Sequence, residues 1–171
     1  AVEEMPLSVT LEAIVREVDA LSVSGFLGAI LLLGESGEHL EHCAAPGLPS
    51  ACMAGAEGLS IDSSAFTAAA DIDSDVGWST LRELAARQQL HICCSIPIRS
   101  AQAALLGAFV LYHPERQGPQ AADIEIIDFV VHTVGLLVHR TRADSAIRIS
   151  EARLRLAVDH ADVGFWDVDF V

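Results

Sequence analysis

The sequence predicts a domain of the α/β class, in its α+β form, because helical patterns flank short runs of strand-forming residues. Near the start of the chain, apolar residues recur at helical spacing at Leu11, Ile14, Val15, Val18 and Leu21. A second and longer pattern begins at about Gln120 and carries Ile126, Ile127, Val130, Val131, Val134, Leu137 and Val138. Between these patterns lie short apolar runs rich in β-forming residues.

The first helix and the first hairpin follow from local signals. Ser8 or Thr10 is the expected N-cap of the helix, and Gly25 is expected to end it. Ala29–Leu33 is predicted as a buried strand and His39–Cys43 as the returning strand, with a short polar turn between them.

A second helix-and-hairpin group follows. Trp78, Leu81, Leu84 and Ala85 recur at helical spacing, which predicts a helix between Trp78 and Leu90. The strands predicted next are Leu90–Arg99 and Ala104–His113. No glycine or proline interrupts residues 136–162, so the long helix is expected to continue toward Ile149.

Composition limits the possible functions. The 171 residues carry a formal net charge of −14, and every cationic side chain except histidine is an arginine. Such a surface repels phosphate backbones and anionic membranes, so no nucleic-acid partner is expected. The longest apolar run, Gly28–Gly34, is too short to span a bilayer, and Glu3 and Glu4 replace the basic start of a secretory signal. We therefore expect a cytoplasmic protein with no membrane partner in this fragment.

The candidate metal and thiol clusters have ordinary structural explanations. On a strand, His39 and His42 point to opposite faces and cannot readily share one zinc ion. Adjacent Cys93 and Cys94 should also point to opposite faces, so we expect reduced thiols that act mainly as small apolar side chains. The motifs of serine hydrolases, phosphate-binding loops and zinc proteases are absent. No catalytic residue and no metal ligand is expected.

Residues 71–116 resemble a GAF domain of the kind found in bacterial sensor kinases and cyclic-dinucleotide enzymes. The matching motifs are Asp71-Ile72, Trp78, Leu81-Arg82, Cys93-Cys94-Ser95-Ile96-Pro97-Ile98-Arg99-Ser100 and Leu106-Gly107-Ala108-Phe109-Val110-Leu111-Tyr112. Gly28–Pro49 is similar to the first two strands of the family. The resemblance extends from about Leu11 to about Arg142. It implies a central antiparallel sheet with long N- and C-terminal helices on one face and a ligand pocket on the other.

The resemblance also implies which residues contact a ligand and a partner. The ligand-pocket candidates are Phe66, Trp78, Cys93, Cys94, Ser95 and Phe109. The apolar arc of the long helix exceeds what one sheet contact needs, so we expect a homodimer through that helix. Its candidate contacts are Ile127, Val130, Val134 and Leu137. The segment 57–73 departs from the family pattern: either the pocket lid is trimmed, or loop residues are missing from the sequence.

The end of the chain is similar to the start of a PAS domain. Ser150, Glu151 and Arg153–Ala157 match its opening helix, and Gly164, Trp166 and Asp169 match its first strand. A PAS core needs about a hundred residues, so only its beginning is present. The expected domains are a GAF domain at 8–142, a helical connector at 143–161 and a truncated PAS start at 162–171.

Together these patterns predict a non-catalytic sensory domain. The expected partners are a second copy, an unknown small ligand, and PAS and output domains downstream in the same chain. The resemblance implies an output of the histidine kinase or cyclic-di-GMP type. The cofactor is unknown and none is required. The main alternative is a ligand-free dimerisation scaffold; less favoured ones are a thiol redox enzyme and a haem sensor using His91, His132 or His139.

Overall fold

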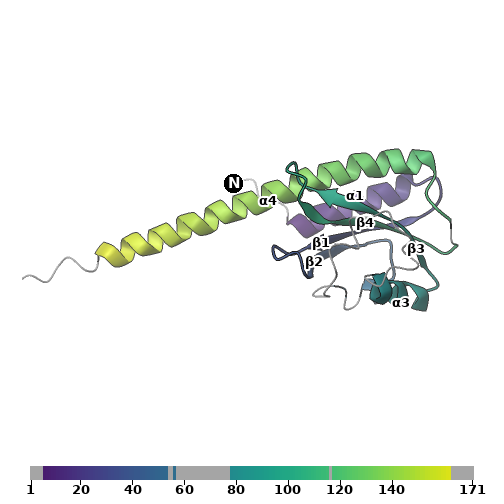
Figure 1. The fold of residues 1–171 in the computed structure, drawn as a ribbon, viewed down its shortest axis with the longest axis horizontal. Coiled ribbons are helices and arrows are strands. Elements are labelled where there is room, and N and C mark those ends of the chain that lie inside the picture. Colours follow the sequence, from purple (N-terminus) through teal and green to yellow (C-terminus); the bar gives the residue numbers. More distant parts are fainter. Residues whose placement is uncertain (1–5, 54–55, 57–77, 116, 163–171) are drawn as a thin grey trace, which may run out of the picture. The chain divides into compact units, whose positions relative to one another are not determined.

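The computed structural model describes residues 6–53, 56, 78–115 and 117–162 (Figure 1). The elements are α1 (Leu7–Leu21), β1 (Leu27–Leu33), β2 (Leu40–Ala44), α2 (Ser50–Met53), α3 (Ser79–Arg87), β3 (His91–Arg99), β4 (Leu105–His113) and α4 (Ala121–Asp162). The chain divides into two compact units, residues 1–138 and residues 139–171. Helix α4 begins in the first unit and ends in the second. No helix among the described residues is long and apolar enough to cross a membrane.

The four strands form one antiparallel sheet in the order β2-β1-β4-β3, which confirms the predicted fold class. Each predicted strand lies within two residues of an observed one. The predicted N-caps of the first helix were wrong, because α1 already begins at Leu7. The carbonyl of Pro6 accepts hydrogen bonds from the backbone N–H groups of Val9 and Thr10. Proline fits at this end because it leaves no helical hydrogen bond unmade.

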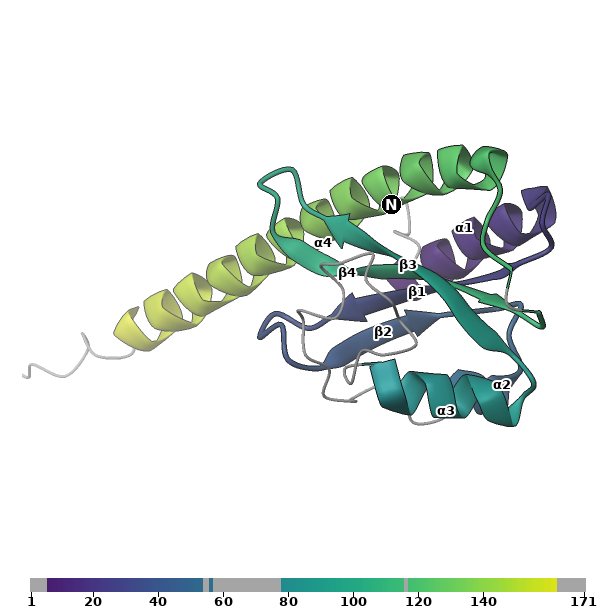
Figure 2. The ribbon, with the colours of Figure 1, turned by 45° about the vertical axis from the view of Figure 1, so that its right-hand side comes forward.

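Helices cover both faces of the sheet (Figure 2). On one face, Leu11, Val15 and Val18 of α1 and the N-terminal part of α4 pack on Ile30, Leu32, Phe109 and Leu111. On the other face, Leu81 and Ala85 of α3 pack with Leu31, Val110 and Tyr112. We call these the α1/α4 face and the α3 face. Alternate strand residues therefore contribute to two separate cores, as the two-residue period of a strand requires.

Asp123 fixes the start of α4 to the loop between α1 and β1. Its side chain is fully buried and accepts hydrogen bonds from the Val23 N–H (2.8 Å), the Ser24 hydroxyl (2.7 Å) and the Gln120 N–H (3.0 Å). Burial alone would raise the pKa of this carboxyl, but the hydrogen bonds outweigh burial and lower it. Asp123 is thus ionised and caps α4 while joining it to a second segment.

Two glycines allow close contacts that larger residues would block. A Cβ atom on Gly28 would lie 2.6 Å from Cζ of Phe109, so the phenyl ring occupies the space above this glycine. A Cβ atom on Gly135 would lie 2.2 Å from the carbonyl oxygen of Arg99, so α4 touches the backbone of β3 at this point. Both contacts pack an element of the α1/α4 face tightly against its neighbour.

Candidate functional site

Trp78 and Phe109 lie on opposite faces of the sheet. Trp78 belongs to the core of the α3 face and is almost fully buried, together with Val110 and Tyr112. Phe109 belongs to the core of the α1/α4 face and is fully buried there. Because Phe109 and Val110 are adjacent on β4, their side chains must point in opposite directions.

A bulge in β3 determines where the two adjacent cysteines point. Ile92 pairs with Tyr112 and Cys94 pairs with Leu111, so Cys93 is the extra residue without a partner position on β4. The Cys93 thiol lies 3.6 Å from the His91 carbonyl oxygen and 3.8 Å from that of Glu115. Cys94 packs against the core of the α1/α4 face. Burial raises the pKa of the Cys94 thiol, and a hydrogen bond from the Ser95 N–H opposes this only in part.

Ser95 has an unusual environment on the α3 face. It pairs directly with Val110, so its side chain lies on the same face as that residue. Only 2% of Ser95 is exposed, and its hydroxyl has no hydrogen-bond partner among the described residues. A buried hydroxyl without a partner costs about 1–3 kcal/mol. Such an atom is a candidate contact for a bound molecule.

The predicted pocket wall therefore needs correction. Trp78 and Ser95 lie on the α3 face, Cys94 and Phe109 on the α1/α4 face, and Cys93 in the bulge of the edge strand. These side chains do not line one cavity. Phe66 and the shortened segment 57–73 lie outside the described residues, so a ligand cavity on the α3 face stays a prediction.

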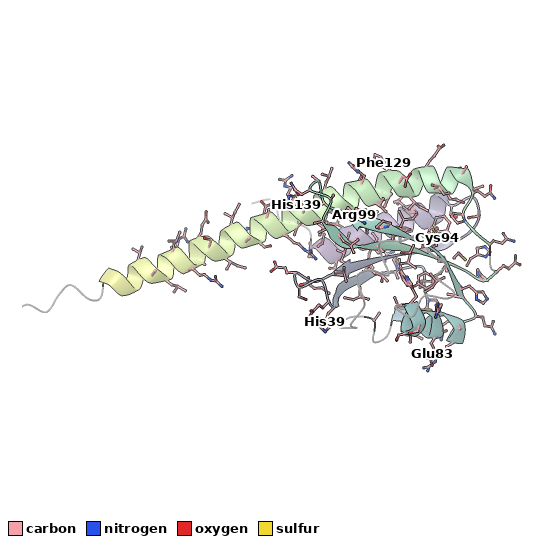
Figure 3. All side chains as sticks on the ribbon, viewed as in Figure 1. His39, Glu83, Cys94, Arg99, Phe129 and His139 are labelled. Carbon is pink, nitrogen blue, oxygen red and sulfur yellow. The ribbon has the colours of Figure 1, made fainter. Side chains whose placement is uncertain are left out.

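The predicted partner contacts of α4 also need correction. Ile127, Val130 and Val134 are buried in the core of the same chain, and Leu137 is partly buried against it. Burial of each fully covered side chain contributes about 1.5–3 kcal/mol to the folded state, so these residues hold α4 on its own sheet. The large apolar side chains that α4 leaves exposed in the first unit are Ile124, Phe129 and Leu136. Figure 3 shows Phe129 on the side of α4 that is turned away from the sheet.

The other candidate groups are dispersed. Within the described residues, no three histidine, cysteine or carboxylate side chains are close enough to hold a metal ion. Cys52, Cys93 and Cys94 are not part of a disulfide. Of the three histidines considered for haem, His91 is partly buried on β3, and His132 and His139 are exposed on α4.

Comparison with known proteins relates the chain to sensors. No known family profile matches it. It is 26% identical, over 147 residues, to the methyl sulfide methyltransferase-associated sensor of Methanosarcina acetivorans; this region is 80% of the chain and only 15% of that relative. A crystal structure of a domain assigned to a two-component sensor histidine kinase of Sinorhizobium meliloti 1021 has a similar fold. Its TM-score is 0.62 at 17% identity, covering 85% of this chain and 99% of that one. The solved structure shows a shared fold, and the relative that matches by sequence is a sensor of which this chain spans only a small part.

Proposed function

We propose that this chain is a sensory domain of the GAF class within a longer signalling protein. It binds a small ligand and passes the binding event through α4 toward the PAS-like segment and an output domain. The output would be a histidine kinase or a cyclic-di-GMP enzyme. The proposal combines the sensor relatives with the antiparallel α+β fold.

The observation that carries the proposal is that the two parts of α4 differ in burial. In the first unit, Ile127, Val134 and Val138 are fully buried in the domain core. In the second unit, Ile147, Ile149, Leu154, Leu156 and Val158 are all more than half exposed. One continuous 42-residue helix thus has a part that belongs to the core and a part whose large apolar side chains are exposed within the described residues. A helix of this kind can report a change in the core to whatever covers its second part.

Ser95 supports a ligand on the α3 face. Its buried hydroxyl can donate to or accept from a polar ligand atom, and the core of the same face, which contains Trp78 and Tyr112, is apolar and aromatic. Small-molecule sites commonly combine a mostly apolar wall with few polar groups of this kind. Ser95 was among the pocket candidates predicted from the sequence, but no sequence pattern indicates that its hydroxyl is unsatisfied.

The exposed apolar residues of α4 support the proposal that a second copy of the chain packs against this helix. Phe129 and Leu136 are seven residues apart, and so are Ile147 and Leu154. Phe129, Leu136 and Ala143 follow one another at seven residues, and Ala143, Ile147, Ser150 and Leu154 at four and three, which is the spacing of a coiled-coil seam. The positions between the first three in this seam are the polar residues Thr133 and Arg140. The buried positions Ile127, Val134 and Val138 fall outside it. The proposed dimer therefore uses a different stripe of α4 from the stripe on the sheet.

Two isoleucines give a matched test of the dimer. Ile147 is 57% exposed and lies in the seam, whereas Ile149 is 54% exposed and lies outside it. Ile147→Glu should shift the sedimentation of the chain toward the monomer, because it places a charge at each of two facing positions. Ile149→Glu should leave the wild-type distribution unchanged. A monomeric wild-type chain at high micromolar concentration, or equal effects of both variants, would exclude this arrangement.

Native mass spectrometry of gently purified protein tests the ligand. A small molecule should co-purify with the wild-type chain, and Ser95→Ala should lose most of it, while Ser79→Ala, an exposed hydroxyl on α3, should retain it. Equal retention by both variants would show that Ser95 does not bind the molecule. A dimeric chain that never retains a molecule would favour the alternative function, a ligand-free dimerisation scaffold, to which the exposed stripe of α4 also corresponds.

A further inference from the structure

A hollow of about 530 Å³ lies where the end of β3 and the turn into β4 meet α4. Its walls include Pro97, Arg99, Ala103, Val131, His132 and Leu136. The volume lies within the range of about 300–1,000 Å³ that is typical of small-molecule sites. The lining combines aliphatic side chains with one guanidinium and one imidazole, and all of it belongs to the first unit.

Arg99 brings a positive charge to this hollow, and no carboxylate of the described residues pairs with it. Three other arginines, Arg16, Arg87 and Arg140, each pair with an acidic residue four positions away. Arg99 forms no ion pair within the described part of the chain, although acidic residues outnumber arginines by 24 to 10. Its Nη1 donates to the Ala103 carbonyl oxygen at 3.1 Å, which steadies the side chain. A guanidinium has five N–H donors, so one such bond leaves capacity for an anion.

Hydrogen bonds fix the shape of the turn that follows Arg99 and joins β3 to β4. The buried Ser100 hydroxyl accepts hydrogen bonds from the N–H groups of Gln102 and Ala104, each at 3.2 Å. The backbone adds two bonds, from the Ser100 N–H to the Ala104 carbonyl and from the Ala103 N–H to the Ser100 carbonyl. Ala103 has a φ of 64°, a left-handed conformation that is costly for a residue with a Cβ atom. On the opposite wall, Gly135 keeps α4 in contact with the Arg99 backbone. Both walls of the hollow are thus held in place before anything binds.

We propose that this hollow binds a small organic anion, namely a carboxylate with a compact apolar body. Arg99 pairs with the carboxylate, for which its planar fork is suited, and His132 supplies a second N–H donor from α4. Val131 and Pro97 contact the apolar body, while Leu136, which the proposed dimer seam uses, only borders the hollow. The site is separate from the α3 face that carries Ser95, and it does not depend on the proposed function.

Benzoate and its neutral isostere benzamide are suitable probes, because they share a ring and differ in charge. Each is titrated into the ¹⁵N-labelled full chain while amide chemical shifts are followed. Benzoate should give saturable shifts at residues 100–104 and 131–136, with a dissociation constant in the millimolar range or below. Benzamide should bind at least about tenfold more weakly, because it lacks the charge that strengthens a bond to arginine.

Variants separate the site from a general charge effect. Arg99→Gln should weaken benzoate binding about tenfold or more, and Arg99→Lys should recover part of the loss. Arg87→Gln is the matched control, because it removes an exposed arginine from α3 and should leave the affinity unchanged. Both residues are exposed, and an unchanged thermal midpoint checks that each variant folds. The proposal is overturned by equal binding of benzoate and benzamide, by shifts that do not saturate or lie elsewhere, or by equal losses in the two glutamine variants.

Discussion

Replacing Gly135 by alanine sets two effects of opposite sign against each other. In an exposed helix interior, glycine is about 0.8–1.0 kcal/mol less favourable than alanine, so helix propensity alone would stabilise the variant. The structure predicts the reverse, because the new Cβ atom would lie 2.2 Å from the carbonyl oxygen of Arg99. Neither atom is the end of a flexible side chain, so either the helix or β3 must move.

The magnitude follows from the difference between these terms. Forcing extra volume into a packed contact costs about 1–3 kcal/mol. Subtracting the gain of about 1 kcal/mol in helix propensity leaves a net loss of up to about 2 kcal/mol in the free energy of unfolding. Urea unfolding of the full chain, followed by circular dichroism, measures this loss.

Gly118→Ala is the control for the glycine substitution itself. Gly118 lies in the loop before α4, and a Cβ atom there would have no neighbour within 4 Å. This variant should keep the wild-type midpoint or rise slightly. If Gly135→Ala instead gained about 1 kcal/mol, as an unhindered helix position would, α4 could not lie against β3 as described.

Three further predictions concern other buried groups. Gly28→Ala should lower the free energy of unfolding in urea by about 1–3 kcal/mol, because its Cβ atom would meet the buried Phe109 ring. Gly34→Ala is the control: its Cβ atom would have no contact closer than 3.7 Å, so stability should change little. Equal effects of the two variants would contradict the packing of Phe109. Ser95→Ala should raise the thermal midpoint of the ligand-free chain, since it removes an unsatisfied buried hydroxyl, and a clear drop would show that this hydroxyl has a partner. Burial raises the pKa of Asp19 from 3.8 to about 6, against one opposing hydrogen bond from the Gly28 N–H, so the folded state binds this proton more tightly than the unfolded state does. The free energy of unfolding should therefore fall as the pH rises from about 4 to about 6. Asp19→Asn should remove the contribution of Asp19 to this fall. Parallel pH profiles of the wild-type and variant proteins would contradict the raised pKa of Asp19.

Local sequence patterns were sufficient to predict the helices and strands, but not to predict on which face of the sheet each side chain lies. The strands around Leu31, Ile98 and Phe109 were predicted within two residues, because each is a short apolar run bounded by turn residues. The direction of Cys94 could not be predicted in the same way. The bulge at Cys93 interrupts the two-residue alternation, and it depends on pairing with β4, which leaves no signal in β3 alone.

The long helix presented a similar difficulty. Its apolar residues form two stripes, one containing Ile127 and Val134 and the other containing Phe129 and Leu136. A single sequence shows that both exist, but only the packed structure shows which stripe the sheet covers. The sequence pattern did not single out Arg99 either, because the hollow that it lines and its lack of an ion pair among the described residues depend on neighbours in three dimensions.

The anchoring of α4 at Asp123 limits how this helix can respond to a bound molecule. Three hydrogen bonds at 2.7–3.0 Å join the carboxylate to Val23, Ser24 and Gln120. A piston-like slide of α4 by one residue, about 1.5 Å along its axis, would stretch the bonds to Val23 and Ser24 beyond hydrogen-bonding distance. Hydrogen bonds to a charged group are worth about 1.5–3 kcal/mol each, so such a slide would cost more than the 1–3 kcal/mol typical of coupling between sites. Swivelling or twisting about the Asp123 end keeps these bonds and is the less costly motion.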